Sequence, residues 1–146
     1  MFHKILVPTD VSDTSRKALD YALEIAKKYN SEVELFHVTY TAQAYWGYAV
    51  SYGILVSQEQ LDESGEAALE AALTGIDVGD VNLTKKHISG HPATAIVEES
   101  KNGFDLIVMG SHGHGPISGV VLGSVAQRVL AHANCPVLVV RANENP

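Results

Sequence analysis

Short apolar runs alternate with stretches of helical periodicity along this chain, and this alternation constrains the fold more than any other feature. Four runs are too short for helices and continuous enough to be strands buried on both faces, at 5–7, 33–38, 104–109 and 136–140. Residues 81–88 alternate only loosely and carry Lys85 and Lys86, a pattern typical of an edge strand. The sequence therefore predicts five strands.

Between these strands the apolar residues recur at helical spacing, which predicts four helices. The first covers positions 18–29, with Asn30 as its stop. Ser57-x-x-Gln60 is a capping box at the start of the second helix. Pro92 suits the first turn of the third, and the last helix begins at or near Ser124.

Because strands and helices alternate, the strands should be parallel, with right-handed crossovers and helices on both faces of the sheet. The predicted fold class is α/β: a doubly wound, Rossmann-like five-stranded parallel sheet, with residues 1–146 forming a single domain. In such sheets ligands bind beyond the carboxyl ends of the strands, where the strand order reverses. Functional residues are therefore expected at Pro8-Thr9-Asp10 and from Met109 onward.

Composition narrows the function classes. Ten Lys and Arg against seventeen Asp and Glu give a net charge of −7, which opposes binding to nucleic acid and to anionic membranes. The one cysteine, Cys135, excludes an internal disulfide and a cysteine-based zinc site. The chain shows no signal-peptide layout and no run of eighteen apolar residues. We therefore expect a cytoplasmic protein with no nucleic-acid or membrane partner.

Glycine is concentrated in residues 110–124, directly after a buried strand; five of the twelve glycines fall there. Glycines let the backbone adopt positive φ and approach a ligand closely. A helix beginning near Ser124 would aim unpaired N–H groups at the same place, an arrangement suited to phosphate. A tight turn followed by a serine helix cap, without any ligand, would also explain this composition.

Two standard phosphate motifs are absent from the chain. It has no G-x-x-x-x-G-K-[ST], and residues 110–124 contain neither Lys nor Arg. Gly113-x-Gly115 begins like a dinucleotide-binding fingerprint, but Ser118 stands where that motif needs its next glycine. The spacing Gly110-x2-Gly113-x9-Gly123-Ser124 instead resembles the nucleotide-binding signature of the universal stress protein family. The resemblance extends over residues 5–12, 35–38, 105–113, 123–130 and 135–140, and only residues 40–56 lack a family pattern.

The resemblance implies a strand order of 3-2-1-4-5 and a site for ATP, ADP or AMP, with Mg²⁺ or Mn²⁺ carried by the phosphates. Residues expected to border the adenine and the ribose are Pro8, Thr9, Asp10, Val38, Met109 and Gly110. Residues expected to contact the phosphates are His112, Gly113, Gly123, Ser124 and Val125.

Several of these residues have alternative explanations. Asp10 follows a strand and could cap the next helix. His112 and His114 form an H-x-H pair, but two histidines without a third ligand are weak evidence for a metal site. Arg128, one turn past Ser124, could reach a phosphate or lie on a solvated helix face.

Two segments point to contacts between proteins. Val137, Leu138, Val139 and Val140 form an apolar strand at the expected sheet edge, where pairing with another chain is favoured. Universal stress proteins often dimerise through this strand, so a homodimer is expected. Residues 40–56 hold four of the six tyrosines and Trp46, and this aromatic segment could form either a nucleotide lid or a dimer contact.

The sequence favours an ATP-binding regulatory or stress-response protein with an unknown downstream partner. Phosphoryl transfer needs cationic charge and a group that orients water, and residues 110–124 offer neither a Lys, an Arg nor an obvious base. Binding is therefore favoured over hydrolysis. The alternatives are an enzyme of slow ATPase or adenylyl chemistry using His112, and an interaction module that needs no nucleotide.

Overall fold

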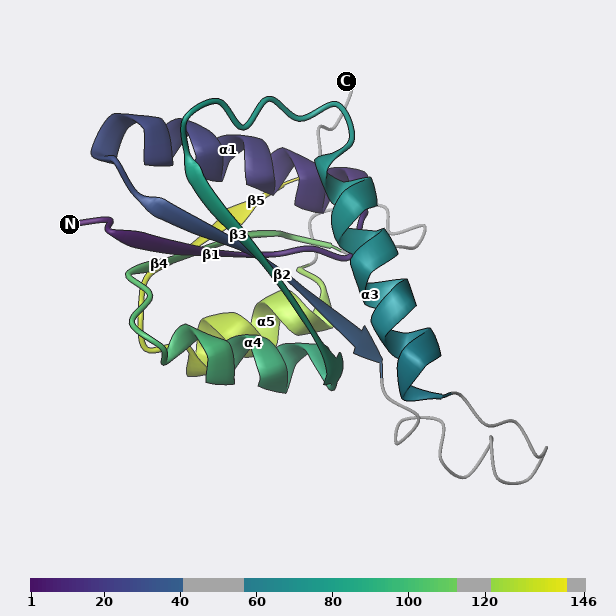
Figure 1. The fold of residues 1–146 in the computed structure, drawn as a ribbon. Helices are drawn as coiled ribbons and strands as arrows, with labels where there is room; N and C mark the ends of the chain where they lie inside the picture. The colour runs from purple at the N-terminus through teal and green to yellow at the C-terminus, as the bar shows by residue number, and fades with distance from the viewer. Residues whose placement is uncertain (41–56, 113–121, 142–146) are drawn as a thin grey trace, which may run out of the picture.

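The computed structural model describes residues 1–40, 57–112 and 122–141. Five parallel strands form one sheet in the order β3-β2-β1-β4-β5 (Figure 1). They are β1 (Lys4–Pro8), β2 (Glu32–Tyr40), β3 (Asn82–Gly90), β4 (Leu106–Gly110) and β5 (Val137–Val140). The predicted fold class and strand order are confirmed, and the order reverses between β1 and β4.

The described helices cover both faces of this sheet (Figure 1). They are α1 (Asp13–Tyr29), α3 (Gln58–Leu73), α4 (Pro92–Ser100) and α5 (Ser124–His132). α1 and α3 pack on one face, and α4 and α5 pack on the other. β1 is buried on both sides: Ile5 and Val7 face the α1 side, and Leu6 faces the α4 side.

Local signals fix where the helices begin and end. The Ser12 side chain caps α1 by accepting a hydrogen bond from the Ser15 N–H, and Asn30 ends that helix with φ 56°. Ser57 and Gln60 form the predicted capping box of α3. α4 begins at Pro92, whose missing N–H would have no helical partner in any case.

Both sheet edges match the sequence analysis. β3 is the more exposed edge strand and carries Lys85 and Lys86. β5 is the other edge, and the Leu138 side chain is 37% exposed there. Among the described residues, no helix combines the length and apolar character needed to cross a membrane.

Cys135 packs against the core between the sheet, α4 and α5. Burial, and then the Asp105 carboxylate, raise the pKa of its thiol. The thiol therefore stays protonated near neutral pH, which suits a small core residue better than a reactive nucleophile.

Gly65 lets α3 pack closely on β3. A Cβ at this position would lie 2.5 Å from Nδ1 and 2.7 Å from Cγ of the His87 ring. Glycine inside a helix normally costs about 1 kcal/mol relative to alanine, so its presence here reflects the packing.

We expect Gly65→Ala to lower the free energy of unfolding by roughly 1–2 kcal/mol, because the clash outweighs the gain in helix propensity. Urea denaturation measures the change. Ser64→Ala, on the exposed face of the same turn, should change stability by less than about 0.5 kcal/mol. A Gly65→Ala variant more stable than the parent would contradict this account of the α3–β3 contact.

Candidate functional site

A cavity of about 400 Å³ opens beyond the carboxyl ends of β1, β2 and β4, where the strand order reverses. This is the crevice in which doubly wound sheets bind ligands. Every predicted site residue that the structure describes lines it: Pro8, Thr9, Asp10, Val38, Met109, Gly110, His112, Gly123, Ser124 and Val125. Gly113, the remaining predicted residue, and His114 lie outside the described residues, as does most of the aromatic segment.

The turn after β1 is held by its own side chains. The Thr9 hydroxyl oxygen accepts a hydrogen bond from the Val11 N–H at 3.1 Å, and Asp10 Oδ1 accepts one from the Ser12 N–H at 3.0 Å. Asp10 therefore stabilises this turn and also lines the cavity, whereas the cap of α1 is Ser12. Val11 is held at φ 68°, a left-handed conformation that β-branched residues rarely adopt.

His37 supports this turn from β2. Its Nδ1 lies 2.8 Å from the Thr9 carbonyl oxygen, so Nδ1 carries the proton and donates to that oxygen. The Thr9 N–H in turn donates to the Phe36 carbonyl oxygen at 2.9 Å. Sequence analysis did not find His37, because its role depends on the pairing of β2 with β1.

The N-terminus of α5 opens onto the cavity without a side-chain cap. Gly123 is the N-cap and has no side chain that could accept a hydrogen bond from the first turn. Ser124 is the first helical residue. The serine-cap explanation of this sequence is therefore wrong. Ser124, Val125 and Ala126 all line the cavity, and the N–H groups of a helix's first turn have no intrahelical acceptor. This helix end is positively polarised and suited to an anion.

Two signature glycines are also required by packing. A Cβ on Gly110 would lie 2.9 Å from Thr14 Cγ2 and 3.1 Å from the Ser15 nitrogen. A Cβ on Gly123 would lie 3.0 Å from the Ser111 carbonyl oxygen, which accepts a hydrogen bond from the Gly123 N–H at 2.7 Å. Substituting either glycine would therefore disturb the backbone as well as any ligand contact.

His112 has one ring nitrogen engaged and one without a partner. Its Nδ1 lies 3.0 Å from the Ser111 hydroxyl oxygen. Its Nε2 is buried and has no hydrogen-bond partner among the residues that the structure describes. A buried polar atom without a partner is costly, and a ligand oxygen in the cavity would satisfy it.

Sequence analysis missed the apolar part of the cavity. Phe36, Tyr40, Pro92 and Ile96 line it together with Val38 and Met109. Tyr40 also meets the His91 ring edge to face at a centroid distance of 5.9 Å. Applying the carboxyl-end rule to β3 would have found Pro92, which follows that strand directly. The apolar wall and the polar helix end suit a ligand with a flat apolar part and an anionic part.

Charge around the cavity is sparse. Among the described residues that line it, none is Lys or Arg, and Asp10 is the one carboxylate. Arg128 lines a separate groove between α4 and α5, with Lys101 and His132. Across the described parts of the chain, no three His, Cys, Asp or Glu side chains are grouped to hold a metal ion.

Comparison with known proteins agrees with this arrangement. A sequence model of the universal stress protein family matches residues 1–141. The chain belongs to the universal stress protein family. It is 37% identical to the universal stress protein MJ0531 of Methanocaldococcus jannaschii, over 97% of this chain and 83% of that protein.

Solved structures of universal stress proteins share the fold. MJ0577, also from Methanocaldococcus jannaschii, superposes with a TM-score of 0.78 at 31% identity, and 99% of each chain is covered. A universal stress protein in complex with cAMP superposes with a TM-score of 0.64 at 28% identity, over 96% of this chain and 97% of the other.

The left-handed Val11 gives a stability test of the cavity's first turn. We expect Val11→Asn to raise the free energy of unfolding by about 1 kcal/mol, because asparagine tolerates positive φ better than valine. Asn30→Val, at the other non-glycine residue with positive φ in the described part of the chain, should lower it by a similar amount. Thermal unfolding of both variants measures the two changes, and a destabilised Val11→Asn would show that Val11 is not strained.

Proposed function

We propose that this universal stress protein binds adenine nucleotides in the cavity between β1 and β4 and acts as a stress-response regulator. The observation that carries this proposal is the uncapped N-terminus of α5, which opens onto the same cavity as an apolar wall. The helix end offers N–H donors to a phosphate. The relative in complex with cAMP supports an adenine nucleotide as the ligand class.

The expected placement of the nucleotide follows from the chemistry of the lining. The adenine would lie against Phe36, Val38 and Ile96, and the ribose near Asp10 and Gly110. The phosphates would lie at Ser124 and Val125, within reach of the unpartnered Nε2 of His112. Asp10, a hydrogen-bond acceptor, suits ribose hydroxyl groups.

The charge of the cavity bears on the choice of nucleotide. A helix N-terminus contributes only about half an elementary charge, and no Lys or Arg lines the cavity. The protein therefore leaves most of the charge of a triphosphate uncompensated. A divalent cation, Mg²⁺ or Mn²⁺, would be held by the phosphates of ATP rather than by a protein donor set.

The same scarcity of charge favours binding over hydrolysis. Rapid phosphoryl transfer depends on cationic groups at the developing charge and on a residue that orients water. The described residues that line the cavity include no Lys or Arg to supply that cationic charge. We propose that ATP, ADP or AMP acts as a signal in the cytoplasm, where the bound state is recognised by a downstream protein partner.

Ser124→Glu separates the ligand contact from the fold. A carboxylate in the first turn of a helix is stabilising, so the melting temperature should hold or rise. The same carboxylate would repel phosphate, so isothermal titration with AMP, and with ATP with and without Mg²⁺, should show affinity falling at least about tenfold. Ser124→Gln, which adds a side chain of similar size without charge, should lose clearly less affinity for the nucleotides. Equal losses for both variants would contradict phosphate binding at this helix end.

We further propose a homodimer through β5. An edge strand is formed by Val137, Leu138, Val139 and Val140. Its outer backbone groups have no neighbouring strand in the described part of the chain, and Leu138 is 37% exposed. Pairing of two such edges would continue the sheet across the dimer.

Leu138→Asp should convert the dimer to a monomer, because it places a charge in the strand-to-strand contact. Sedimentation velocity at micromolar concentration measures the state of association. Tyr21→Asp, at an exposed aromatic residue of α1, is the matched control and should leave the dimer intact. A monomeric parent protein at this concentration would overturn the proposed interface.

A further inference from the structure

An ionic cluster lies beneath α4, on the sheet face away from α1 and outside the lining of the nucleotide cavity. It contains Glu34 from β2, Lys86 from β3 and Glu99 from α4, with Lys4 of β1 nearby. Glu99 is only 7% exposed. Glutamates are seldom buried to this degree unless they are paired, so the partners of both carboxyl groups decide what the cluster does.

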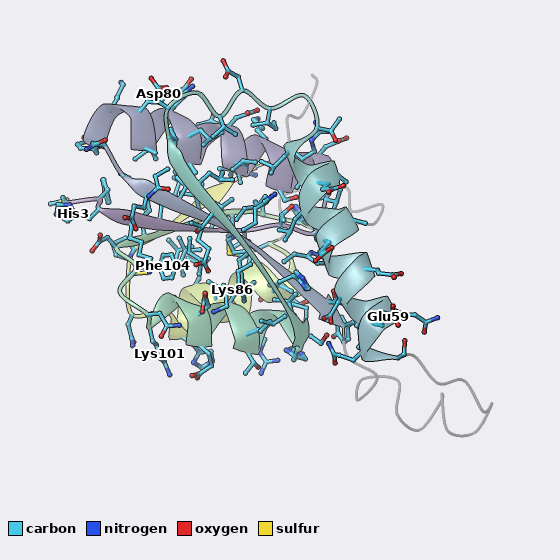
Figure 2. All side chains as sticks on the ribbon, viewed as in Figure 1. His3, Glu59, Asp80, Lys86, Lys101 and Phe104 are labelled. Atoms are coloured by element: carbon cyan, nitrogen blue, oxygen red, sulfur yellow. The ribbon has the colours of Figure 1, made fainter. Side chains whose placement is uncertain are left out.

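Glu99 is paired through one oxygen. Its Oε1 accepts a hydrogen bond from Lys86 Nζ at 3.0 Å and another from Asn102 Nδ2 at 2.8 Å. Figure 2 shows Lys86 on the side of β3 that faces α4. Burial raises the pKa of Glu99, but hydrogen bonds from Glu34, Lys86 and Asn102 outweigh it, so the net effect lowers this pKa. Glu99 is therefore the ionised member.

Glu34 lies in the opposite situation. Its Oε1 is buried and has no hydrogen-bond partner among the described residues, and its carboxyl group lies beside that of Glu99. Two carboxylates have no proton to share, so this contact requires one of the carboxyl groups to be protonated. Burial first, and then the hydrogen bond and the charge of Glu99, raise the pKa of Glu34 to about 7, against the opposing effect of Lys86 and Lys4.

We propose that Glu34 and Glu99 form a proton-binding pair that fastens α4 to the sheet and thereby couples pH to the nucleotide cavity. The shared proton joins β2 to α4, while Lys86 joins β3 to the same helix. Loss of the proton leaves two carboxylates facing each other with one ammonium group bridging to Glu99.

The link to the cavity runs along α4, and this part of the inference rests on the proposed nucleotide binding. Pro92 and Ile96, in the first two turns of α4, line the cavity. Glu99 follows Ile96 by one helical turn, on the same buried side of the helix. A change in the contacts that hold α4 at Glu99 is therefore expected to shift Pro92 and Ile96, which form part of the cavity wall beside the expected base.

The direction of the pH effect follows from the two pKa values. A raised pKa means that the folded state holds a proton which the unfolded chain releases, so the contribution of Glu34 is full below about pH 4.5. It is lost as pH rises toward about 7. Glu99, with its lowered pKa, acts in the opposite sense and only at more acid pH. Between pH 5 and pH 8 the effect of Glu34 dominates the pair.

Melting temperatures of the full chain between pH 5 and pH 8, without nucleotide, test the proton pair directly. Glu34→Gln replaces the protonated carboxyl group by an amide that can donate to Glu99, so it should melt about 3 °C or more above the parent at pH 8. The difference should shrink toward zero at pH 5. Glu98→Gln, at an exposed carboxylate of the same helix, should give a pH-independent difference. A pH-independent difference for Glu34→Gln as well would overturn the pair.

Lys86→Met supplies an independent variant. Without the ammonium group, which lowers the pKa of both carboxyl groups, the pair should keep its proton to higher pH. The loss of stability on raising the pH should therefore extend to higher pH than in the parent, because the folded-state pKa of Glu34 sets its upper end. If Lys86→Met leaves the pH dependence of stability unchanged, the assignment of the proton-binding pair is wrong.

Titration with cAMP tests the coupling, because its phosphodiester keeps one charge over this pH range. Parent affinity should fall at least about threefold from pH 6 to pH 8, and Glu34→Gln should show no such fall. An equal fall in cAMP affinity for the parent and for Glu34→Gln would overturn the coupling. The melting temperatures would still test the Glu34–Glu99 pair separately. Absence of binding of cAMP, AMP and ATP at every pH would overturn the proposed function and the coupling together.

Discussion

The architecture depends on a close backbone contact between the end of β4 and the beginning of α1. Gly110 makes it possible, because any Cβ there would collide with Thr14 and with the Ser15 backbone. The contact brings the turn after β1 beside the exit of β4, and these two segments form opposite sides of the cavity. A glycine of the nucleotide-binding signature is thus required to assemble the crevice, before any ligand contact is considered.

The capping of the helices separates structural from functional ends. α1 and α3 satisfy their first N–H groups with Ser12 and with the Ser57–Gln60 box, whereas α4 and α5 have no side-chain cap, and both of these helices begin at the cavity. Natural helices seldom leave such groups without partners, and those that do are ready to bind an anion. An apolar wall from β2 and α4 completes a site suited to a nucleotide rather than to a free phosphate.

Local sequence patterns predicted the strands, the helices and the part of the site that follows β1 and β4. Strand order, caps and the residues following β1 and β4 follow from short-range signals together with the family resemblance. Residues whose role depends on pairing between elements were missed: His37 acts through β1, and Ile96 reaches the cavity only because α4 packs on β2. Glu34 and Glu99 lie far apart in the sequence, and their contact depends on the register of three strands and one helix.

The position of β1 at the centre of the sheet has a consequence for synthesis on the ribosome. β1 emerges first and pairs with β2 early, but its other neighbour is β4, with Ile5 opposite Leu106. Until β4 is made, one edge of this largely apolar strand has no partner, and such edges favour association with other chains. Between the synthesis of β1 and that of β4 the nascent chain therefore exposes an unpaired strand edge, and chaperones are expected to bind it during that interval.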